Sequence, residues 1–237
     1  MIDTILFDLD GTLLPIEEGP FIKMYFGLLS DKFLHLGITK EKFIEAIVSG
    51  TVIMRKNDGS KTNEDAFWDF FSQKIGYRKS DIEDIFVNFY SNDFDLVKAS
   101  SNENPLAKEV VKILKSKNYN LVVATNPLFP RIAVEKRIAW AGLDVNDFSF
   151  ITSYENSFYS KPSLNYYENI LKNINKKPEQ CIMVGNDAKE DMAASKLGIK
   201  TYLLVDCLIN LENLDISRFE NGDFKKFLNL VKKLPDV

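Results

Sequence analysis

Cysteine and histidine are almost absent from this chain, which has two cysteines and one histidine among 237 residues. Cys181 and Cys207 are too few for a disulfide framework or a thiolate metal site, so we expect a reducing, cytoplasmic location. His35, near the end of a predicted helix, is interpreted as a packing residue or a partner of the helix dipole. On that interpretation no Ser-His or Cys-His relay is possible. Any hydrolytic chemistry must then depend on carboxylates, lysine or a metal.

The chain also lacks long apolar runs and an excess of basic residues. Its 30 Lys and Arg residues and 34 Asp and Glu residues give a formal net charge of −4. This balance provides no basic footprint for nucleic acid. No run approaches the roughly 18 apolar residues of a membrane helix, and the N-terminus has no signal-peptide pattern. We therefore expect no nucleic-acid or membrane partner, and a monomer or small homo-oligomer.

From about residue 97 onward, apolar strands alternate with amphipathic helices. Strands are predicted at 119–125, 148–153, 180–185 and 200–205, and helices at 104–115, 130–142, 161–174 and 188–198. Asn104 and Pro105 suit the N-cap and first position of the first of these helices, and Gly142 and Gly198 end the second and fourth. Such alternation predicts an α/β fold with a doubly wound parallel sheet.

Residues 15–96 show no strand pattern and instead contain four helical stretches, near 20–36, 39–57, 62–75 and 80–93. Ten of the 18 phenylalanines fall between Phe21 and Phe94, which is enough apolar bulk for a core. We interpret 15–96 as a four-helix cap domain inserted after the first strand. The main domain then comprises 1–14 and 97–237.

The first strand ends in two aspartates, in the sequence ILFDLDGTLL at residues 5–14. Ligands of open parallel sheets bind at the carboxyl ends of strands, where Asp8 and Asp10 are expected. A simple Asx turn is the structural alternative, and an EF-hand loop is disfavoured because its glycine belongs at position six rather than four. A divalent cation would offset the repulsion between the two carboxylates. Asp8 is then a candidate nucleophile, and Asp10, on the same side, a candidate acid and base.

The segment DLDGT resembles the first signature of the haloacid dehalogenase (HAD) superfamily of aspartyl-phosphate phosphatases. VVATN supplies Thr125 and Asn126, which resemble the position where a hydroxyl and the next backbone N–H hold the phosphate. YSKPS supplies Lys161, which resembles the lysine that neutralises the nucleophile and the phosphate. Taken singly, an ordinary strand end and a surface lysine at a helix start are the simpler interpretations. These three signatures and a fourth, described next, occur in order along the chain, and each lies at a predicted strand end.

The fourth signature is MVGNDAKEDM, which resembles the acidic segment that supplies a magnesium ligand and a supporting carboxylate. It departs from the commoner glycine-aspartate pattern, because Asn186 follows Gly185. We interpret Asp187 as the metal ligand, with Asn186 as a possible oxygen ligand and Asp191 as the supporting carboxylate. The alternative is that Asp187, in capping-box spacing with Glu190, is only a helix N-cap.

The resemblance implies the strand order 5-4-1-2-3 and a helical cap of the phosphoglucomutase-phosphatase-like branch. It also implies a Mg²⁺-dependent phosphatase of small phosphorylated metabolites. In such an enzyme Asp8 attacks phosphorus, Asp10 transfers the proton, and the metal is held by the Asp8 carboxylate, the Asp10 carbonyl and Asp187. The alternatives are a sugar-phosphate mutase, a dehalogenase, a phosphonatase with a Schiff-base lysine in its cap, and a catalytically silent binding module.

The loop between the second and third cap helices is expected, by the same resemblance, to face the active site. Its sequence is MRKNDGSKTN, at residues 54–63. Arg55, Lys56 and Asn57 are candidates for binding an anionic or hydroxylated part of the substrate, because guanidinium and amide groups suit such partners. The alternative is a solvated helix end whose cations favour the C-terminal dipole.

Overall fold

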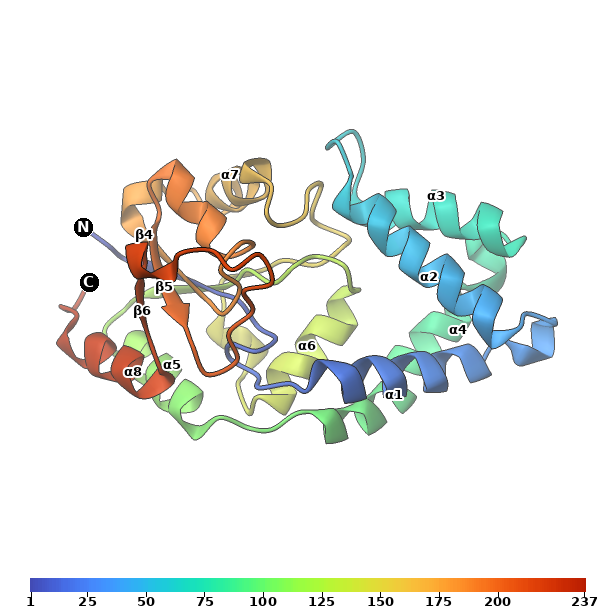
Figure 1. Cartoon of the computed structure of the whole chain (residues 1–237), viewed down its shortest axis with the longest axis horizontal. Coiled ribbons are helices and arrows are strands. Elements are labelled where there is room, and N and C mark those ends of the chain that lie inside the picture. The colour runs from blue at the N-terminus through green and yellow to red at the C-terminus, as the bar shows by residue number, and fades with distance from the viewer.

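A six-stranded parallel sheet lies in the part of the protein drawn at the left of Figure 1. The computed structural model describes all residues, Met1–Val237. The strands lie in the order β3-β2-β1-β4-β5-β6, and each neighbouring pair is parallel. Their bounds are β1 Thr4–Phe7, β2 Asn120–Val123, β3 Phe150–Ile151, β4 Cys181–Gly185, β5 Lys200–Leu204 and β6 Glu220–Gly222. The predicted order 5-4-1-2-3 is confirmed, and β6 extends the sheet beyond β5.

Alternate residues of each buried strand point to opposite faces of the sheet, so both faces carry apolar side chains. Helices cover both faces and bury these side chains. Helices α5 (Pro105–Ser116), α6 (Arg131–Trp140) and α8 (Phe224–Lys233) lie on one face, where Phe7 meets Phe227 with ring centroids 6.2 Å apart. On the other face, Leu6 packs in a cluster with helix α7 (Leu164–Asn173) and the short 3₁₀ helix η5 (Met192–Leu197). This arrangement confirms the doubly wound α/β fold.

Helices α1 to α4, which follow β1 in the chain, lie beside the sheet and are drawn in blue to green in Figure 1. They are α1 Glu18–Asp31, α2 Lys40–Arg55, α3 Asn63–Ile75 and α4 Lys79–Ser91, with 3₁₀ helices η1 at Leu34–Leu36 and η2 at Asp93–Ser100. Aromatic side chains hold them together; Phe33 and Phe43, for example, stack with centroids 4.4 Å apart. All four match the predicted helical stretches. None of the helices in the protein is long and apolar enough to cross a bilayer.

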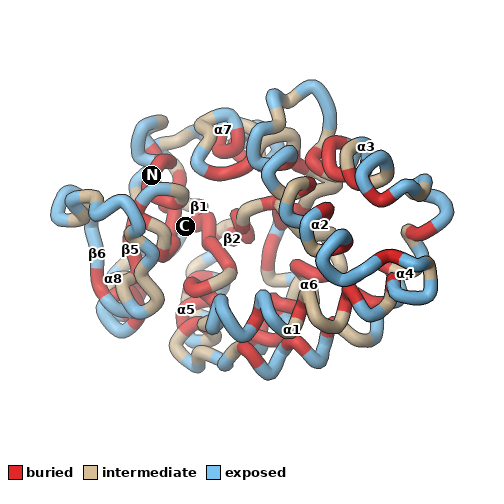
Figure 2. Tube along the Cα trace, turned by 45° about the vertical axis from the view of Figure 1, so that its right-hand side comes forward, coloured by how far each residue is buried: buried red, intermediate tan, exposed pale blue.

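The two segments that connect these helices to the sheet pair with each other. Ile16 and Ser101 form an antiparallel bridge, and the Asn102 N–H donates to the Pro15 carbonyl over 3.0 Å. The buried apolar cluster is continuous from one face of the sheet into helices α1 to α4 and includes 47 residues. Figure 2 shows buried residues, in red, in β1, in α6 and in helices α1 to α4. The helical segment therefore shares its core with the sheet, and the division at 14/15 and 96/97 stays a prediction.

The segment 188–198 departs from its prediction. The sequence predicts an α-helix, but the structure has a turn followed by the 3₁₀ helix η5. The Asp191 N–H donates four residues back, to the Asp187 carbonyl, whereas the N–H groups of Ala194 and Gly198 donate three residues back. The Asp187 and Asp191 carboxylates accept backbone N–H groups in this turn, and such side-chain acceptors compete with helix formation. Gly198 does end the segment, with φ +86°.

Candidate active site

Asp8 follows directly after β1 and begins a tight loop. Its N–H donates to the Val184 carbonyl of β4 over 2.9 Å, so the carboxylate starts from a fixed position at the sheet edge. Gly11 has φ +77°, a conformation that favours glycine. A Cβ at Gly11 would also lie only 2.3 Å from the Asn186 amide nitrogen. The glycine of DLDGT therefore lets the first loop close against the fourth signature.

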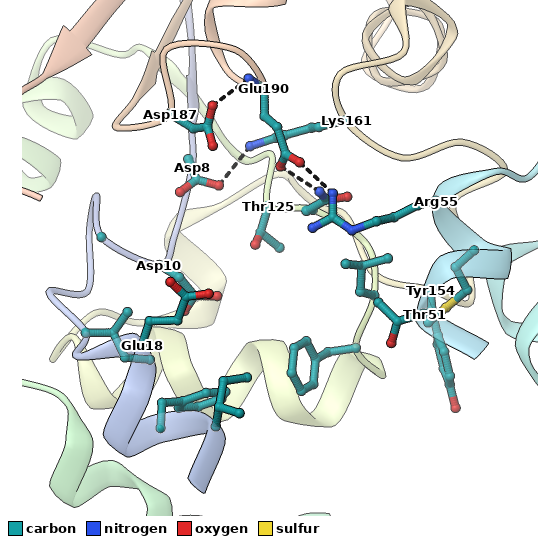
Figure 3. Close-up of a pocket in the computed structure, with 18 of the residues that line it drawn as sticks. Asp8, Asp10, Glu18, Thr51, Arg55, Thr125, Tyr154, Lys161, Asp187 and Glu190 are labelled. Atoms are coloured by element: carbon teal, nitrogen blue, oxygen red, sulfur yellow. Dashed lines mark hydrogen bonds and ion pairs between the residues drawn. The ribbon is translucent and has the colours of Figure 1, made fainter. Parts of the chain in front are cut away.

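Lys161 is buried between two carboxylates. Its Nζ lies 2.8 Å from Asp8 Oδ1 and 2.6 Å from Asp191 Oδ1, and only 2% of the residue is exposed. Burial by itself lowers the pKa of Lys161, but the Asp191 and Asp8 charges prevail and raise that pKa well above its usual value. The ammonium group thus stays charged. Figure 3 shows it directed at Asp8. The helix after it begins at Leu164, three residues later than the predicted start at 161.

Asp187 caps the turn that follows β4. Its Oδ1 accepts the N–H groups of Lys189, over 2.8 Å, and Glu190, over 2.7 Å. This is the capping role that the sequence left open beside metal binding. The remaining carboxylate oxygen makes no hydrogen bond, and the side chain lies next to Asp8 in Figure 3. Capping and metal binding by Asp187 are therefore compatible.

Asn186 and Asp191 support the same corner of the site. The Asn186 side chain accepts from the Thr12 hydroxyl over 3.0 Å and donates to the Cys207 carbonyl over 2.7 Å. Asp191 Oδ2 accepts the Asp187 N–H over 2.9 Å. Burial raises the pKa of Asp191 to about 7, and the Lys161 charge opposes this rise. A Cβ at Gly185 would lie 2.1 Å from Asp191 Oδ2, which explains the glycine at the end of β4.

Thr125 and Asn126 follow β2 at the neighbouring strand end. The Thr125 carbonyl accepts from the Thr152 hydroxyl over 2.7 Å and from the Tyr166 hydroxyl over 2.8 Å. These bonds fix the backbone and leave the Thr125 side chain lining the cavity. The Asn126 amide donates to Glu190 Oε2 over 2.8 Å, and its Oδ1 is buried without a partner. This strand end thus presents a hydroxyl and a free acceptor near Asp8.

The three predicted cap residues lie in different surroundings. Arg55 reaches the cavity, where its Nη1 lies 2.5 Å from Glu190 Oε1 (Figure 3). Lys56 is exposed and does not line the cavity. The Asn57 side chain donates to the Lys61 carbonyl over 2.9 Å and to Asn63 Oδ1 over 2.8 Å, so it shapes its own loop. Substrate binding by these three residues stays a prediction. The geometry favours it only for Arg55, because only Arg55 lines the cavity.

Arg137 is a site residue that the sequence reasoning missed. It lies on α6, its side chain is 1% exposed, and its Nη1 forms an ion pair with Asp10 Oδ2. The guanidinium also lies over the Phe129 ring, 4.5 Å from the centroid. The signal in the sequence was an arginine on a helix face otherwise formed by Ala133, Val134 and Ile138, all buried. Buried arginines are paired, and this one is paired with Asp10.

Most of these side chains line one cavity of about 660 Å³. Its lining includes the predicted residues Asp8, Asp10, Arg55, Thr125, Asn126, Lys161, Asn186, Asp187 and Asp191. His35 lies on η1, is exposed and does not line the cavity.

The polar side chains of this cavity offer oxygen atoms, which are the donors that Mg²⁺ prefers. No group of three His, Cys, Asp or Glu side chains is placed to hold a metal. Mg²⁺ commonly needs only one or two carboxylates together with waters and phosphate oxygens, so these residues fit it.

A cavity at the strand ends of a doubly wound sheet, lined by two carboxylates and a buried, charged lysine, is a candidate enzyme active site. The chain belongs to the haloacid dehalogenase-like hydrolase family, which matches residues 2–198. The predicted family is therefore confirmed, and the protein is a hydrolase.

Individual relatives are distant. The chain is 25% identical over 200 residues to pyrophosphatase PpaX of Bacillus cereus, covering 84% of this chain and 82% of that protein. The HAD phosphatase of Thermococcus onnurineus has a similar fold, with a TM-score of 0.63 at 18% identity and complete coverage of both chains. The magnesium-bound HAD-hydrolase YfnB of Bacillus subtilis has a TM-score of 0.57 at 17% identity, over 97% of this chain and 98% of that one.

Proposed function

We propose that this hydrolase is a Mg²⁺-dependent phosphatase that cleaves small phosphorylated metabolites through an aspartyl-phosphate intermediate. The observation that carries the proposal is the buried triad of Asp8, Lys161 and Asp191. Asp8 is 8% exposed, has its Oδ1 2.8 Å from a lysine that stays charged, and lines the cavity. A carboxylate that is paired with a lysine ammonium group and directed into the cavity is suited to nucleophilic attack. The HAD phosphatase and pyrophosphatase relatives support phosphorus as the target.

In the proposed reaction, Asp8 attacks phosphorus and the bond from phosphorus to the leaving oxygen breaks. Protonated Asp10 transfers its proton to that oxygen, so the alcohol leaves neutral. Ionised Asp10 then removes a proton from water, and the resulting hydroxide attacks phosphorus, which releases inorganic phosphate and regenerates Asp8. Lys161 offsets negative charge throughout. Burial raises the pKa of Asp10, which favours the protonated form needed first, while Arg137 opposes this effect.

Asp8, the Asp10 carbonyl and Asp187 would hold the metal, with Asn186 as the alternative oxygen ligand. The magnesium-bound YfnB supports this cofactor by similarity. When bound, Mg²⁺ supplies positive charge that stabilises the phosphoryl oxygens. Thr125 and Asn126 would orient the phosphate through the hydroxyl and the backbone N–H.

Replacing the nucleophile tests this proposal. We expect Asp8→Asn to lower kcat for 4-nitrophenyl phosphate by about 10³-fold or more, since loss of a nucleophile removes most of the chemistry. Mg²⁺-dependent phosphate binding should largely survive. Asp3→Asn is the matched control, because Asp3 pairs with Lys176 outside the cavity. Turnover by Asp8→Asn at the rate of the unaltered enzyme would exclude covalent catalysis by Asp8.

A further inference from the structure

The cavity extends well beyond the carboxylates, between helices α1 to α4. Six aromatic side chains from these helices line that end: Phe21, Tyr25, Phe67, Trp68, Phe86 and Tyr90. All six are buried, at 5–7% exposure. This end of the cavity, which we call the aromatic chamber and define by these residues, meets the catalytic carboxylates in one space of about 660 Å³. That volume lies within the range of sites that enclose a whole small molecule.

We infer that the preferred substrate is a phosphate monoester whose alcohol portion is uncharged and apolar, with one or two rings or an equivalent branched hydrocarbon. The inference rests on the proposed phosphatase function and specifies its substrate class. Large apolar walls favour such a group because its burial removes apolar surface from water, and facing aromatic rings add stacking contacts.

The charges in the cavity argue against a second anionic group on the substrate. Lys161 and Arg55 are the cationic side chains of the lining, and both are already paired. Lys161 is held by Asp8 and Asp191, and Arg55 by Glu190. No cation lines the aromatic chamber, so a distal carboxylate or phosphate would be buried without a partner, which is unfavourable. Glu18, which also lines the cavity, would add repulsion.

The hydrogen-bonding groups of the chamber argue against a sugar. The Tyr25 and Tyr90 hydroxyls are 2.7 Å apart and bond to each other. The Thr51 hydroxyl donates to the Ile47 carbonyl over 3.0 Å. The Trp68 indole N–H is fully buried, beside the Tyr154 hydroxyl. A polyhydroxylated substrate would therefore leave several of its hydroxyls unsatisfied in the chamber.

Phosphate esters of primary alcohols test the inference at similar leaving-group chemistry. Benzyl phosphate carries an apolar ring, phosphoglycolate a second anion, and glucose 6-phosphate several hydroxyls. We expect kcat/KM for benzyl phosphate to exceed each of the other two by about tenfold or more, because sites reject ligands that leave buried polar groups unpaired. A preference for phosphoglycolate or glucose 6-phosphate would overturn the substrate class while phosphatase activity stands. Absence of turnover of every ester, including 4-nitrophenyl phosphate, would instead overturn the proposed function and the inference with it.

A pair of tryptophan variants locates the preference in the chamber. Trp68→Leu should reduce the ratio of kcat/KM for benzyl phosphate over glucose 6-phosphate by about tenfold, since it removes a wall of the chamber. Trp140→Leu is the matched control, because Trp140 lies on α6 outside the cavity lining. A ratio of two substrates is independent of the fraction of folded enzyme, so it remains valid if either variant is less stable. An unchanged ratio in Trp68→Leu would contradict the assignment.

Discussion

The buried Arg137 side chain forms an ion pair with Asp10 of the cavity lining, although 127 positions separate the two residues in the sequence. The pair is incomplete. Arg137 Nη2 and Asp10 Oδ1 are both buried without a hydrogen-bond partner. The candidate acid and base therefore has a cation on Oδ2, whereas its Oδ1 has no hydrogen-bond partner.

This pair predicts a shift in the pH dependence of catalysis. Burial is the main cause of the raised pKa of Asp10, and the Arg137 charge lowers that pKa. Removal of the charge in Arg137→Met should raise the pKa further, so protonated Asp10 persists to higher pH. The alkaline fall of kcat/KM, which reports groups of the free enzyme, should then move to higher pH. Arg131→Met, on the same helix but paired at the surface with Glu135, is the control. A profile unchanged in position, or moved to lower pH, would contradict the prediction.

Asp187→Asn separates metal binding from helix capping. The amide keeps an oxygen that accepts the Lys189 and Glu190 N–H groups, but it loses the negative charge. If Asp187 is a metal ligand, the Mg²⁺ concentration for half-maximal activity should rise by about tenfold or more, as altered metal sites commonly show. The melting temperature should change little. Titration of activity with Mg²⁺, together with thermal unfolding of the same variant, measures both effects. An unaltered Mg²⁺ requirement would mean that Asp187 acts only as a cap, and Asn186 would then be the remaining candidate for the metal ligand.

Two glycine variants isolate the contact between the first loop and the fourth signature. Gly11 and Gly37 have nearly equal backbone conformations, with φ +77° and +74°. A Cβ at Gly37 meets no atom within 4 Å, whereas one at Gly11 lies 2.3 Å from Asn186 Nδ2. Gly37→Ala should cost about 1–2 kcal/mol in the free energy of unfolding, from the backbone conformation alone. Gly11→Ala should cost about 1–3 kcal/mol more, because of the overpacking, and should also reduce kcat. Denaturant unfolding of both variants provides the comparison, and equal losses would exclude the steric contribution.

The sequence by itself determined the parallel sheet and the positions of Asp8, Asp10 and Thr125 after strand ends, whereas the strand order came from the family resemblance. Lys161 lies ten residues after the end of β3 rather than at a strand end. Alternation of apolar strands with helices requires a parallel sheet, and the carboxyl ends of parallel strands lie along one edge. Polar residues that follow such strands are therefore brought together by any fold that buries the strands. Helices α1 to α4 could also be predicted from the sequence, because the apolar periodicity that indicates a helix is a local pattern.

Only the tertiary structure decided which groups pair. The sequence did not predict the Arg137–Asp10 ion pair or the contact of Arg55 with Glu190, because each joins elements far apart along the chain. It also predicted an α-helix where a turn and η5 occur, since the hydrogen bonds of the Asp187 and Asp191 carboxylates depend on Lys161 and on the close approach to Gly185. The aromatic chamber likewise exists only once the four helices pack over the sheet edge. Local periodicity specifies which face of an element is buried, but the partner of a buried charge is set by packing between elements.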